Sequence, residues 1–273
     1  MLEGEDQQRR IVGIVLVRNE DVFVERAIRN ISDFCDHIIV ADNFSKDQTW
    51  EIVTLLVKDL VNIERHRIRK PSESHDLIKD YAGTHTWIFG VDGDEIYDPT
   101  GLREFRKDIL AGRFDDWWVI FGNVLNCVSL DPRAGTATGH LAPPSRSMTK
   151  LYNFGLISAW RGPCIERLHG GTPVFKAGYD GSYRLNIHEK TAWEESKFRC
   201  LHTCFLRRSS MDRKQTRERP NIMEKSARGL GLRARLGFLR IPNTNTSTSW
   251  KRQKYLRGDE VTKDVTCFFC DQP

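Results

Sequence analysis

The 273-residue sequence has no long apolar run and no glycine-rich phosphate loop. No segment approaches the roughly 20 consecutive apolar residues of a membrane-spanning helix, and residues 1–10 are polar and acidic rather than signal-like. The first apolar run is followed by Arg18-Asn19-Glu20-Asp21, which contains neither glycine nor lysine. This disfavours the phosphate loop of many nucleotidyltransferases and the G-x-G-x-x-G turn of dinucleotide-dependent oxidoreductases. Because no segment resembles a membrane-spanning helix or a signal peptide, we expect a cytoplasmic protein.

The sequence also lacks the cysteine spacing that is typical of a disulfide scaffold or a zinc site. The seven cysteines form an odd set in a chain of this length, so we expect reduced thiols. Cys267-Phe-Phe-Cys270 is a C-x-x-C, and Cys200-Leu-His-Thr-Cys204 offers further ligands. A structural zinc site normally needs two well-spaced pairs, so zinc is not expected.

Excess positive charge is confined to the C-terminal part. Residues 212–273 carry 14 Lys and Arg against 7 Asp and Glu, whereas the residues before them carry 28 against 30. Such a tail can bind anionic lipid, a phosphorylated acceptor or nucleic acid, but is more often a solvated appendage. We expect a basic extension over residues 211–273, partly helical or flexible. Peripheral contact with the inner face of a membrane is the alternative, and nucleic acid is an unlikely partner.

Buried strands and amphipathic helices alternate along the first hundred residues. Ile11–Val17 is a continuous apolar run, typical of a parallel strand buried on both faces. Residues 21–34 follow at helical spacing, and the alternation continues to a fourth strand at Thr86–Val91. The pattern predicts an α/β fold with a mostly parallel central sheet flanked by helices. We expect a polar tail over residues 1–10 and one domain over residues 10–210.

Local signals predict further details. Asn19 and Ser45 precede predicted helices and suit helix caps. Asp98-Pro99 suits a cap followed by proline at the first helical position. Residues 74–83 are predicted to form a third helix. Gly, Pro, Ser and Thr dominate residues 129–149, which predicts a long loop.

Three polar clusters follow predicted strands at the point where each strand ends. They are Arg18-Asn19-Glu20, Asp42 to Asp47, and Asp92 to Glu95. Ligands of open α/β sheets bind beyond the carboxyl ends of the strands, so we expect the three clusters to meet in one crevice.

The third cluster, Asp92-Gly93-Asp94-Glu95, suits a hard divalent cation. With one glycine between them, the carboxylates of Asp92 and Asp94 can approach one ion where the backbone is least bulky. Mg²⁺ or Mn²⁺ held by one or two carboxylates and completed by diphosphate oxygens neutralises charge on a leaving phosphate. A solvated acidic turn is the alternative interpretation.

These motifs together resemble the glycosyltransferases of family 2, which have the GT-A fold and use nucleotide-sugars. In that family the first strand ends in Asn-Glu, here Asn19-Glu20, and the second in Asp-x-x-Ser-x-Asp, here Asp42-Asn-Phe-Ser45-Lys-Asp47. The third motif is Asp-x-Asp, here Asp92-Gly-Asp94. The resemblance covers residues 10–100 well.

The resemblance implies a role for each of these residues. Asp42 would face the base or ribose, Asp92 the ribose and metal, and Asp94 the metal below the diphosphate. Family members usually carry an Arg or Asn pair before the metal strand, whereas this sequence has His75-Asp76 and Lys79-Asp80. The expected nucleotide-sugar contacts are Val17, Asn19, Glu20, Asp42, Ser45, Lys79, Asp92 and Gly93, with His75 as a rival to Lys79.

Inverting transfer also needs a carboxylate base that takes a proton from the acceptor hydroxyl. Glu166, in Trp160-Arg-Gly-Pro-Cys-Ile-Glu166, resembles the Glu of a Gly-x-x-His-Glu pattern found in some relatives, with Ile165 in place of the His. Glu189, in the pair His188-Glu189, is the rival. Many GT-A enzymes add a late histidine to the metal shell, so His202 is the expected third metal ligand and would favour Mn²⁺ over Mg²⁺.

We therefore expect an inverting, metal-dependent hexosyltransferase that uses a nucleotide-sugar, with a UDP-sugar as the expected donor. The acceptor would be a glycan, a lipid-linked saccharide or a cell-surface polymer precursor, which no residue distinguishes. A nucleotidyltransferase of sugar phosphates is one alternative. A non-catalytic protein that binds anions or nucleic acid through its basic tail is the other.

Overall fold

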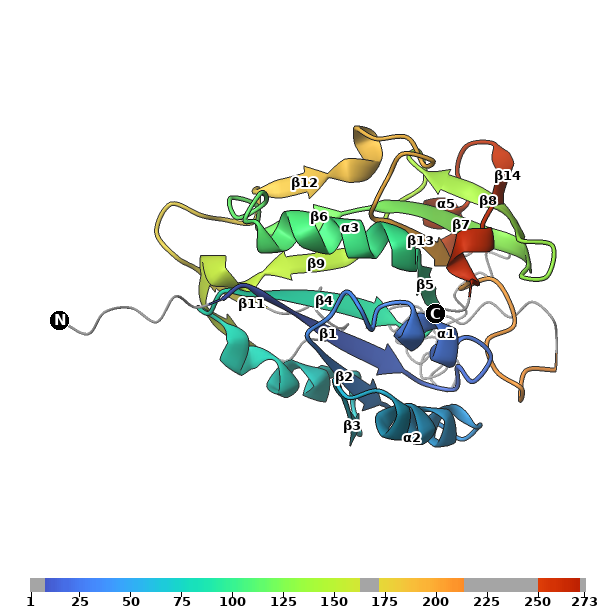
Figure 1. Ribbon diagram of the computed structural model, residues 1–273, viewed down its shortest axis with the longest axis horizontal. Helices are drawn as coiled ribbons and strands as arrows, with labels where there is room; N and C mark the ends of the chain where they lie inside the picture. The colour runs from blue at the N-terminus through green and yellow to red at the C-terminus, as the bar shows by residue number, and fades with distance from the viewer. Residues whose placement is uncertain (1–7, 163–171, 214–249, 271–273) are drawn as a thin grey trace, which may run out of the picture.

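The computed structural model describes residues 8–162, 172–213 and 250–270 (Figure 1). At its centre lies a seven-stranded sheet with the strand order β12-β6-β9-β4-β1-β2-β3. β1 pairs in parallel with both β2 and β4, and β2 pairs in parallel with β3, whereas β9 runs antiparallel to β4 and β6. The strands are β1 (Arg10–Val17), β2 (His37–Asp42), β3 (Ile63–Arg67), β4 (Thr86–Asp92), β6 (Val119–Phe121), β9 (Lys150–Asn153) and β12 (Arg184–Asn186).

Both faces of this sheet are covered, which is why β1 reads as an unbroken apolar run. Ile11 and Val15 of β1 pack with the helices α1, α2 and α3 on one face, whereas Val12 and Ile14 pack into a second cluster on the other. The first face carries α1 (Val24–Arg29), α2 (Thr49–Asp59) and α3 (Pro99–Leu110), and the second carries the 3-10 helices η1 (Pro71–Leu77) and η2 (Lys79–Tyr81) and the pair β10 (Ile157–Arg161) and β11 (Thr172–Phe175). The predicted α/β fold with a mostly parallel, helix-flanked sheet is confirmed.

A second sheet of five strands begins directly beyond β4 and has the order β14-β8-β7-β13-β5. Its own core contains Leu125, Leu201 and Phe268. β13 runs antiparallel to β5 and places His202 opposite Glu95. The strands are β5 (Glu95–Tyr97), β7 (Asn123–Asp131), β8 (Thr136–Ala142), β13 (Arg199–His202) and β14 (Glu260–Asp264).

The loop predicted over residues 129–149 is wrong, because β7 and β8 form a hairpin there. Asp131 closes its turn by accepting hydrogen bonds from the backbone N–H groups of Arg133 and Ala134, at 3.0 and 3.1 Å. A Cβ on Gly139 would overlap the carbonyl oxygen of Asn126 on β7. Glycine at that position therefore allows close strand approach, and does not signal a loop.

Helix boundaries also differ from several sequence predictions. α1 covers six residues rather than the predicted 21–34, and residues 71–81 form two 3-10 helices rather than one α-helix. Neither Asn19 nor Ser45 caps a helix, because their polar atoms bind other loop residues. Asp98 does cap α3, accepting a hydrogen bond from Thr100 N at 3.0 Å.

Residues 250–270 pack against the body of the protein, although they lie within the predicted extension over residues 211–273. β14 pairs with β8, and the 3-10 helix η6 (Thr266–Phe268) buries Phe268. Asn30 donates hydrogen bonds to the carbonyl oxygens of Tyr97 and Phe268, both at 2.8 Å. The remaining short helices are α5 (Trp250–Tyr255), η3 (Phe154–Leu156) and η5 (Ile187–Glu189). Within the described ranges, no helix combines the length and apolar character required to span a bilayer.

Candidate nucleotide-sugar site

The carboxyl ends of β1, β2 and β4 meet at one edge of the larger sheet. Val17 lies opposite Asp42 across β1 and β2, and Leu16 lies opposite Asp92 across β1 and β4. The chain leaves β1 toward β2 on one side, while β4 adds on the other side, which makes this a topological switch point. Ligands of open α/β sheets bind at such points. The structure thus brings the three predicted polar clusters together.

Hydrogen bonds tie the loop after β1 to the loop after β2. The backbone N–H of Asn19 donates to Ser45 Oγ at 2.9 Å, and the Ser45 hydroxyl in turn donates to Asp42. The side-chain oxygen of Asn19 accepts from the backbone N–H of Lys46 at 2.7 Å. Asn19 adopts a φ of 53°, a left-handed conformation that Asn tolerates better than most residues. Asn19, Ser45 and Asp42 therefore form one connected rim.

Asp42 is fully buried and forms an ion pair with Arg67 of β3, whose Nη1 lies 3.0 Å from its Oδ2. The Arg67 guanidinium lies 4.1 Å from the ring centre of Trp50 and 5.5 Å from that of Phe44. Phe44 is 50% exposed and has a φ of 50°, which is uncommon for a bulky residue. An exposed aromatic ring can stack on a flat base. The neighbouring carboxylate and guanidinium can bind the polar edge of that base.

Asp94 is held by an arginine from the far part of the chain. Arg208 is 5% exposed, and its Nη1 contacts both Asp94 Oδ2 and Glu20 Oε1, the latter at 3.2 Å. A Cβ on Gly93 would overlap Glu20 Oε2, so a larger residue there would displace the Glu20 carboxylate that contacts Arg208. Glu20, predicted to contact the nucleotide-sugar, therefore anchors Arg208 beside Asp94.

Asp92 belongs to a second buried charge cluster. Lys150 of β9 is 1% exposed, and its Nζ lies 3.5 Å from Asp92 Oδ2 and 3.0 Å from Glu95 Oε1. Tyr97 donates a hydrogen bond to Glu95 Oε2 at 3.0 Å. Burial raises the pKa of Glu95 to about 7, although the Lys150 ammonium opposes the shift. The site thus holds a fixed cation next to each aspartate of the Asp-Gly-Asp motif.

His202 lies buried next to these carboxylates. Its Nδ1 is 2.8 Å from Asn126 Oδ1, and Thr203, the next residue, donates from its backbone N–H to the Asp94 carbonyl oxygen at 2.9 Å. Burial lowers the pKa of His202 to about 3, even though Asp94 pulls it upward, so the ring is neutral near pH 7. With Nδ1–H directed at the Asn126 amide oxygen, Nε2 carries the lone pair that a metal ligand needs.

The structure does not arrange the predicted metal ligands Asp92, Asp94 and His202 as a preformed metal site. Within the described ranges, no group of three or more His, Cys, Asp or Glu is arranged to hold a metal ion. Asp92 and Asp94 each carry a cationic partner on a different element. Two carboxylates completed by diphosphate oxygens are a sufficient protein contribution for Mg²⁺ or Mn²⁺.

The other predicted residues are less well placed. Lys79 is exposed and pairs with Asp76 at 3.1 Å, away from the Asp-Gly-Asp motif. Glu189 of η5 is likewise exposed, and its recorded ionic contact is with His188, 3.9 Å away. Glu166 lies outside the described residues. Val17 is buried, and its carbonyl oxygen accepts from the backbone N–H of Asn43 at 2.9 Å. Val17 therefore shapes the site through backbone and packing.

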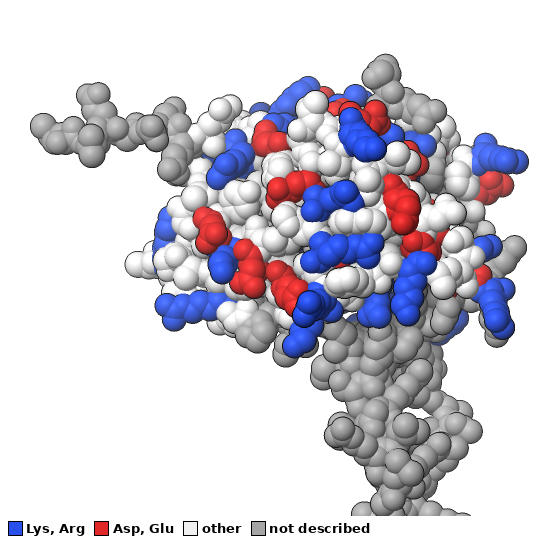
Figure 2. Space-filling view, turned by 90° about the horizontal axis from the view of Figure 1, so that it is seen from below, with Lys and Arg blue, Asp and Glu red and all other residues white. Residues whose placement is uncertain are grey.

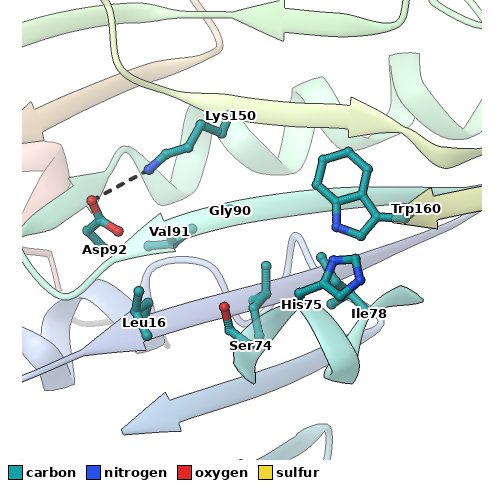
Figure 3. A pocket seen from close by; sticks show the side chains of 10 residues that line it. Leu16, Ser74, His75, Ile78, Gly90, Val91, Asp92, Lys150 and Trp160 are labelled. Atoms are coloured by element: carbon teal, nitrogen blue, oxygen red, sulfur yellow. Dashed lines mark ion pairs between the residues drawn. The ribbon is translucent and has the colours of Figure 1, made fainter. Parts of the chain in front are cut away.

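A small pocket opens on the η1 side of Asp92 (Figure 3). Trp160 and His75 lie toward one end, and Asp92 with Lys150 lies toward the other. Gly90, which follows Ile88 on the same face of β4, lines the wall between them. A neighbouring groove also includes His75 and reaches Gly162.

Lys150 and Arg67 were not among the site residues predicted from the sequence. Lys150 is the first residue of β9, and its burial beside Asp92 and Glu95 becomes apparent only from the pairing of β9 with β4. Arg208 is 5% exposed and pairs with Asp94, a contact that its local sequence does not indicate. Ser209, which donates to Asp47 at 2.5 Å, carries no signal in the sequence.

Comparisons with known proteins identify the family of the chain. The family model described as Glycosyl transferase family 2 matches residues 14–161. The chain is 28% identical over 138 residues to the SPbeta prophage-derived glycosyltransferase SunS of Bacillus subtilis (strain 168), which covers 50% of this chain and 30% of that protein. It is 26% identical over 148 residues to an uncharacterized glycosyltransferase of Rickettsia bellii (strain RML369-C), covering 53% and 46%. The matched part thus spans less than half of either relative.

Two solved structures are more distant. S. aureus TarS 1-349 is similar with a TM-score of 0.39 and 16% identity over 65% of this chain and 60% of that chain. Glucosyl-3-phosphoglycerate synthase from Mycobacterium tuberculosis, in complex with Mn²⁺, UDP and glucosyl-3-phosphoglycerate, has a TM-score of 0.32 and 17% identity over 41% and 43%. Since the family model matches more than half of its residues, the chain belongs to glycosyl transferase family 2.

Proposed function

We propose that this protein is an inverting, metal-dependent hexosyltransferase that transfers a sugar from a nucleotide-sugar, with a UDP-sugar as the donor. One observation carries the proposal. Asp92-Gly93-Asp94 ends the strand next to β1 at the switch point of the sheet, beside the rim of Asn19, Ser45 and Asp42. Family membership supports the same class of reaction.

The nucleoside would bind over the ends of β1 and β2. Asp42 and Arg67 offer a carboxylate and a guanidinium to the polar edge of a base or to ribose hydroxyls. Phe44 offers an exposed ring on which a base can stack. A base with both donors and acceptors on its edge, such as uracil, suits this pair.

The diphosphate would lie between the two buried cations, Arg208 and Lys150. Each is already paired with a carboxylate of the Asp-Gly-Asp motif. Asp92 and Asp94, with His202 through Nε2, would hold Mg²⁺ or Mn²⁺ together with the diphosphate oxygens. When bound, that cation supplies further neutralisation of the leaving diphosphate. Arg208 and Lys150 keep the charge of the aspartates balanced and orient their carboxylates.

Inversion requires a base on the face of the sugar opposite the diphosphate. Glu189 and Glu166 remain the two predicted bases. Glu189 is exposed and follows β12, which runs parallel to β6, so it lies at the same end of the sheet as the carboxyl end of β4. That position supports a residue that meets an acceptor entering from solvent.

We further propose a glycan, a lipid-linked saccharide or a cell-surface polymer precursor as the acceptor, and a cytoplasmic location. Peripheral membrane contact through the basic tail is a prediction about residues that mostly lie outside the described ones. Figure 2 shows Lys and Arg interspersed with Asp and Glu on the face seen from below, so this face lacks the single-sign charge that binding to nucleic acid favours.

Calorimetric titration of UDP, GDP and other nucleoside diphosphates, with and without Mn²⁺, tests the proposal. The wild type should bind one diphosphate in a metal-dependent manner, whereas Asp94→Asn should lose at least tenfold in affinity, or about 1.4 kcal/mol. Asp180→Asn, at an exposed loop carboxylate, is the matched control and should bind like the wild type. Absence of binding to every diphosphate under every metal would contradict the proposed function.

A further inference from the structure

We propose that the short helix α5 borders the site on its acceptor side, and that Lys251 on this helix binds a phosphate group carried by the acceptor. This inference deepens the proposed function and rests on it. Among the proposed acceptors, it favours those that carry phosphate over a neutral glycan.

α5 lies at the end of the site opposite the nucleoside. The rim of Asn19, Ser45 and Asp42 stands over β1 and β2, and the Asp-Gly-Asp motif follows at the end of β4, on the other side of β1. Beyond this motif the second sheet begins at β5, on which β13 places His202 opposite Glu95. α5 adjoins His202 from the second sheet. It therefore borders the site on the side away from the nucleoside, where an acceptor can enter.

Hydrogen bonds hold α5 to the turn that follows β8. Ser145 Oγ donates to the carbonyl oxygen of Tyr255 at 2.8 Å, and the backbone N–H of Arg146 donates to the carbonyl oxygen of Lys254 at 3.0 Å. The ring of Tyr255 packs edge-on against that of His202, with centroids 5.1 Å apart and planes 82° apart. The helix is thus fixed beside a residue of the site.

Lys251 lies on the face of α5 that is directed toward His202. Residues four apart on a helix are neighbours, so Lys251 shares a face with Tyr255, whose ring contacts His202. The pKa of His202 reflects the same proximity. Burial lowers it most and Asp94 opposes the shift, whereas the Lys251 ammonium lowers it further.

The charge of Lys251 is not balanced by the protein in the part of the chain that the structure describes. Lys251 is half-buried, yet no carboxylate of the described ranges pairs with its ammonium group. The other two cations of the site differ, since Lys150 pairs with Glu95 and Arg208 pairs with Asp94. A partly buried charge without a counter-charge favours an anion supplied by a ligand.

Phosphate is the anion that suits this position. Lysine binds phosphate as a point charge, and a phosphate monoester carries a charge of about −1.5 to −2 near pH 7. The diphosphate of the donor is a poorer candidate, because Arg208 and Lys150 already flank the two aspartates that it would approach. A lysine that serves only solubility would be expected on the outward face of α5, where Arg252 is exposed.

Calorimetric titration of glycerol 3-phosphate into protein saturated with UDP and Mn²⁺ tests the inference, because the donor diphosphate site is then filled. The wild type should bind glycerol 3-phosphate but not glycerol, and Lys251→Met should raise the Kd of glycerol 3-phosphate roughly tenfold. Lys251→Arg keeps the charge and should stay within about threefold of the wild type. The Kd of UDP should change less than about twofold in both variants.

Arg257→Met is the matched control. It removes one positive charge from an exposed side chain two residues beyond α5, so it should leave the Kd of glycerol 3-phosphate within about twofold of the wild-type value. Sedimentation with vesicles of phosphatidylglycerol or of phosphatidylcholine identifies the source of the phosphate. Binding to phosphatidylglycerol vesicles that Lys251→Met loses and Arg257→Met keeps would assign a lipid headgroup, whereas the same pattern with glycerol 3-phosphate alone would assign a soluble acceptor.

Four results would overturn the inference. The first is a wild type that binds neither glycerol 3-phosphate nor phosphatidylglycerol vesicles. The second is equal binding by the wild type and Lys251→Met, and the third is an equal loss in Arg257→Met, which would reflect general charge. The fourth is a larger rise for UDP than for glycerol 3-phosphate in Lys251→Met, which would assign Lys251 to the donor. In each case UDP still binds the wild type, so the proposed function survives. A wild type that binds no nucleotide would contradict the proposed function and remove both.

Discussion

The acidic and basic side chains around the Asp-Gly-Asp motif come from different halves of the chain. Glu20, Asp92 and Asp94 lie within the first hundred residues, each at or just beyond the end of a strand of the βα array. Lys150 and Arg208, which pair with them, arrive through β9 and the segment after β13. The first half therefore supplies the carboxylates, which local sequence patterns predict. The second half supplies the cations that offset the cost of burying those carboxylates.

We expect the largest loss of unfolding free energy when Arg208, which pairs with carboxylates of the first half, is replaced. Arg208→Met keeps the length of the side chain but leaves Glu20 and Asp94 buried without their shared guanidinium. Breaking a buried pair on one side costs about 3–5 kcal/mol, so the unfolding free energy from urea titration should fall by roughly that amount.

Arg207→Met is the matched control, because Arg207 is exposed and should change stability by about 0.5 kcal/mol or less. The triple variant Arg208→Met, Glu20→Gln, Asp94→Asn should regain part of the lost stability, because no buried charge then lacks a counter-charge. Equal stability of Arg208→Met and Arg207→Met would show that the two halves are not coupled by this charge cluster.

The first half of the fold follows from its sequence because its signals are local. The apolar runs of β1, β2 and β4 and the carboxyl-end clusters predict the parallel sheet and the meeting of Asn19, Asp42 and Asp92. Neighbouring parallel strands in a βα array bring such ends together whatever the exact helix boundaries are. Short helices such as α1 were less predictable, because tertiary packing fixes their ends.

The second half follows less well, because its contacts depend on strand pairing between distant segments. β8 contains Thr136, Thr138 and Gly139, which suggest a loop until the hairpin brings Gly139 against β7. The burial of Lys150 depends on the pairing of β9 with β4, which lies 60 or more residues earlier, and a lone lysine at the start of a short strand carries no such information. His202 was predicted by resemblance, and its neighbours Asn126 and Glu95 were not.

The contact between Glu95 and Lys150, which also joins the two halves, should make stability depend on pH. Its pKa is raised from 4.5 to about 7, so protonated Glu95 stabilises the fold, and this contribution is lost as pH rises from about 4.5 through 7. Glu95→Gln mimics the protonated form. Relative to that variant, the wild type should lose roughly 2–4 kcal/mol of unfolding free energy between pH 4.5 and pH 8.

Urea titrations of both proteins across this range measure the difference directly. The comparison with Glu95→Gln is needed because His202 also makes stability depend on pH, in the opposite direction. The lowered pKa of His202 removes stability as pH falls from about 6.5 toward 3, and it does so in both proteins. Parallel stability curves for wild type and Glu95→Gln would mean that Lys150 keeps Glu95 ionised throughout, and that the balance of charge between the halves is tighter than the burial of Glu95 implies.

The smallest expected effect lies wholly in the first half, at Phe44. Its φ of 50° costs a bulky residue about 1 kcal/mol, and Asn tolerates that conformation better. Phe44→Asn should therefore raise the unfolding free energy by up to about 1 kcal/mol while weakening UDP binding roughly 5-fold or more, because the exposed ring is lost. Phe44→Leu keeps the unfavourable backbone and removes the ring, so it should lose affinity without gaining stability. Thermal unfolding and UDP titration of Phe44→Asn and Phe44→Leu distinguish the effect of backbone strain from that of base stacking. Tight UDP binding by Phe44→Asn would show that Phe44 does not belong to the nucleoside site.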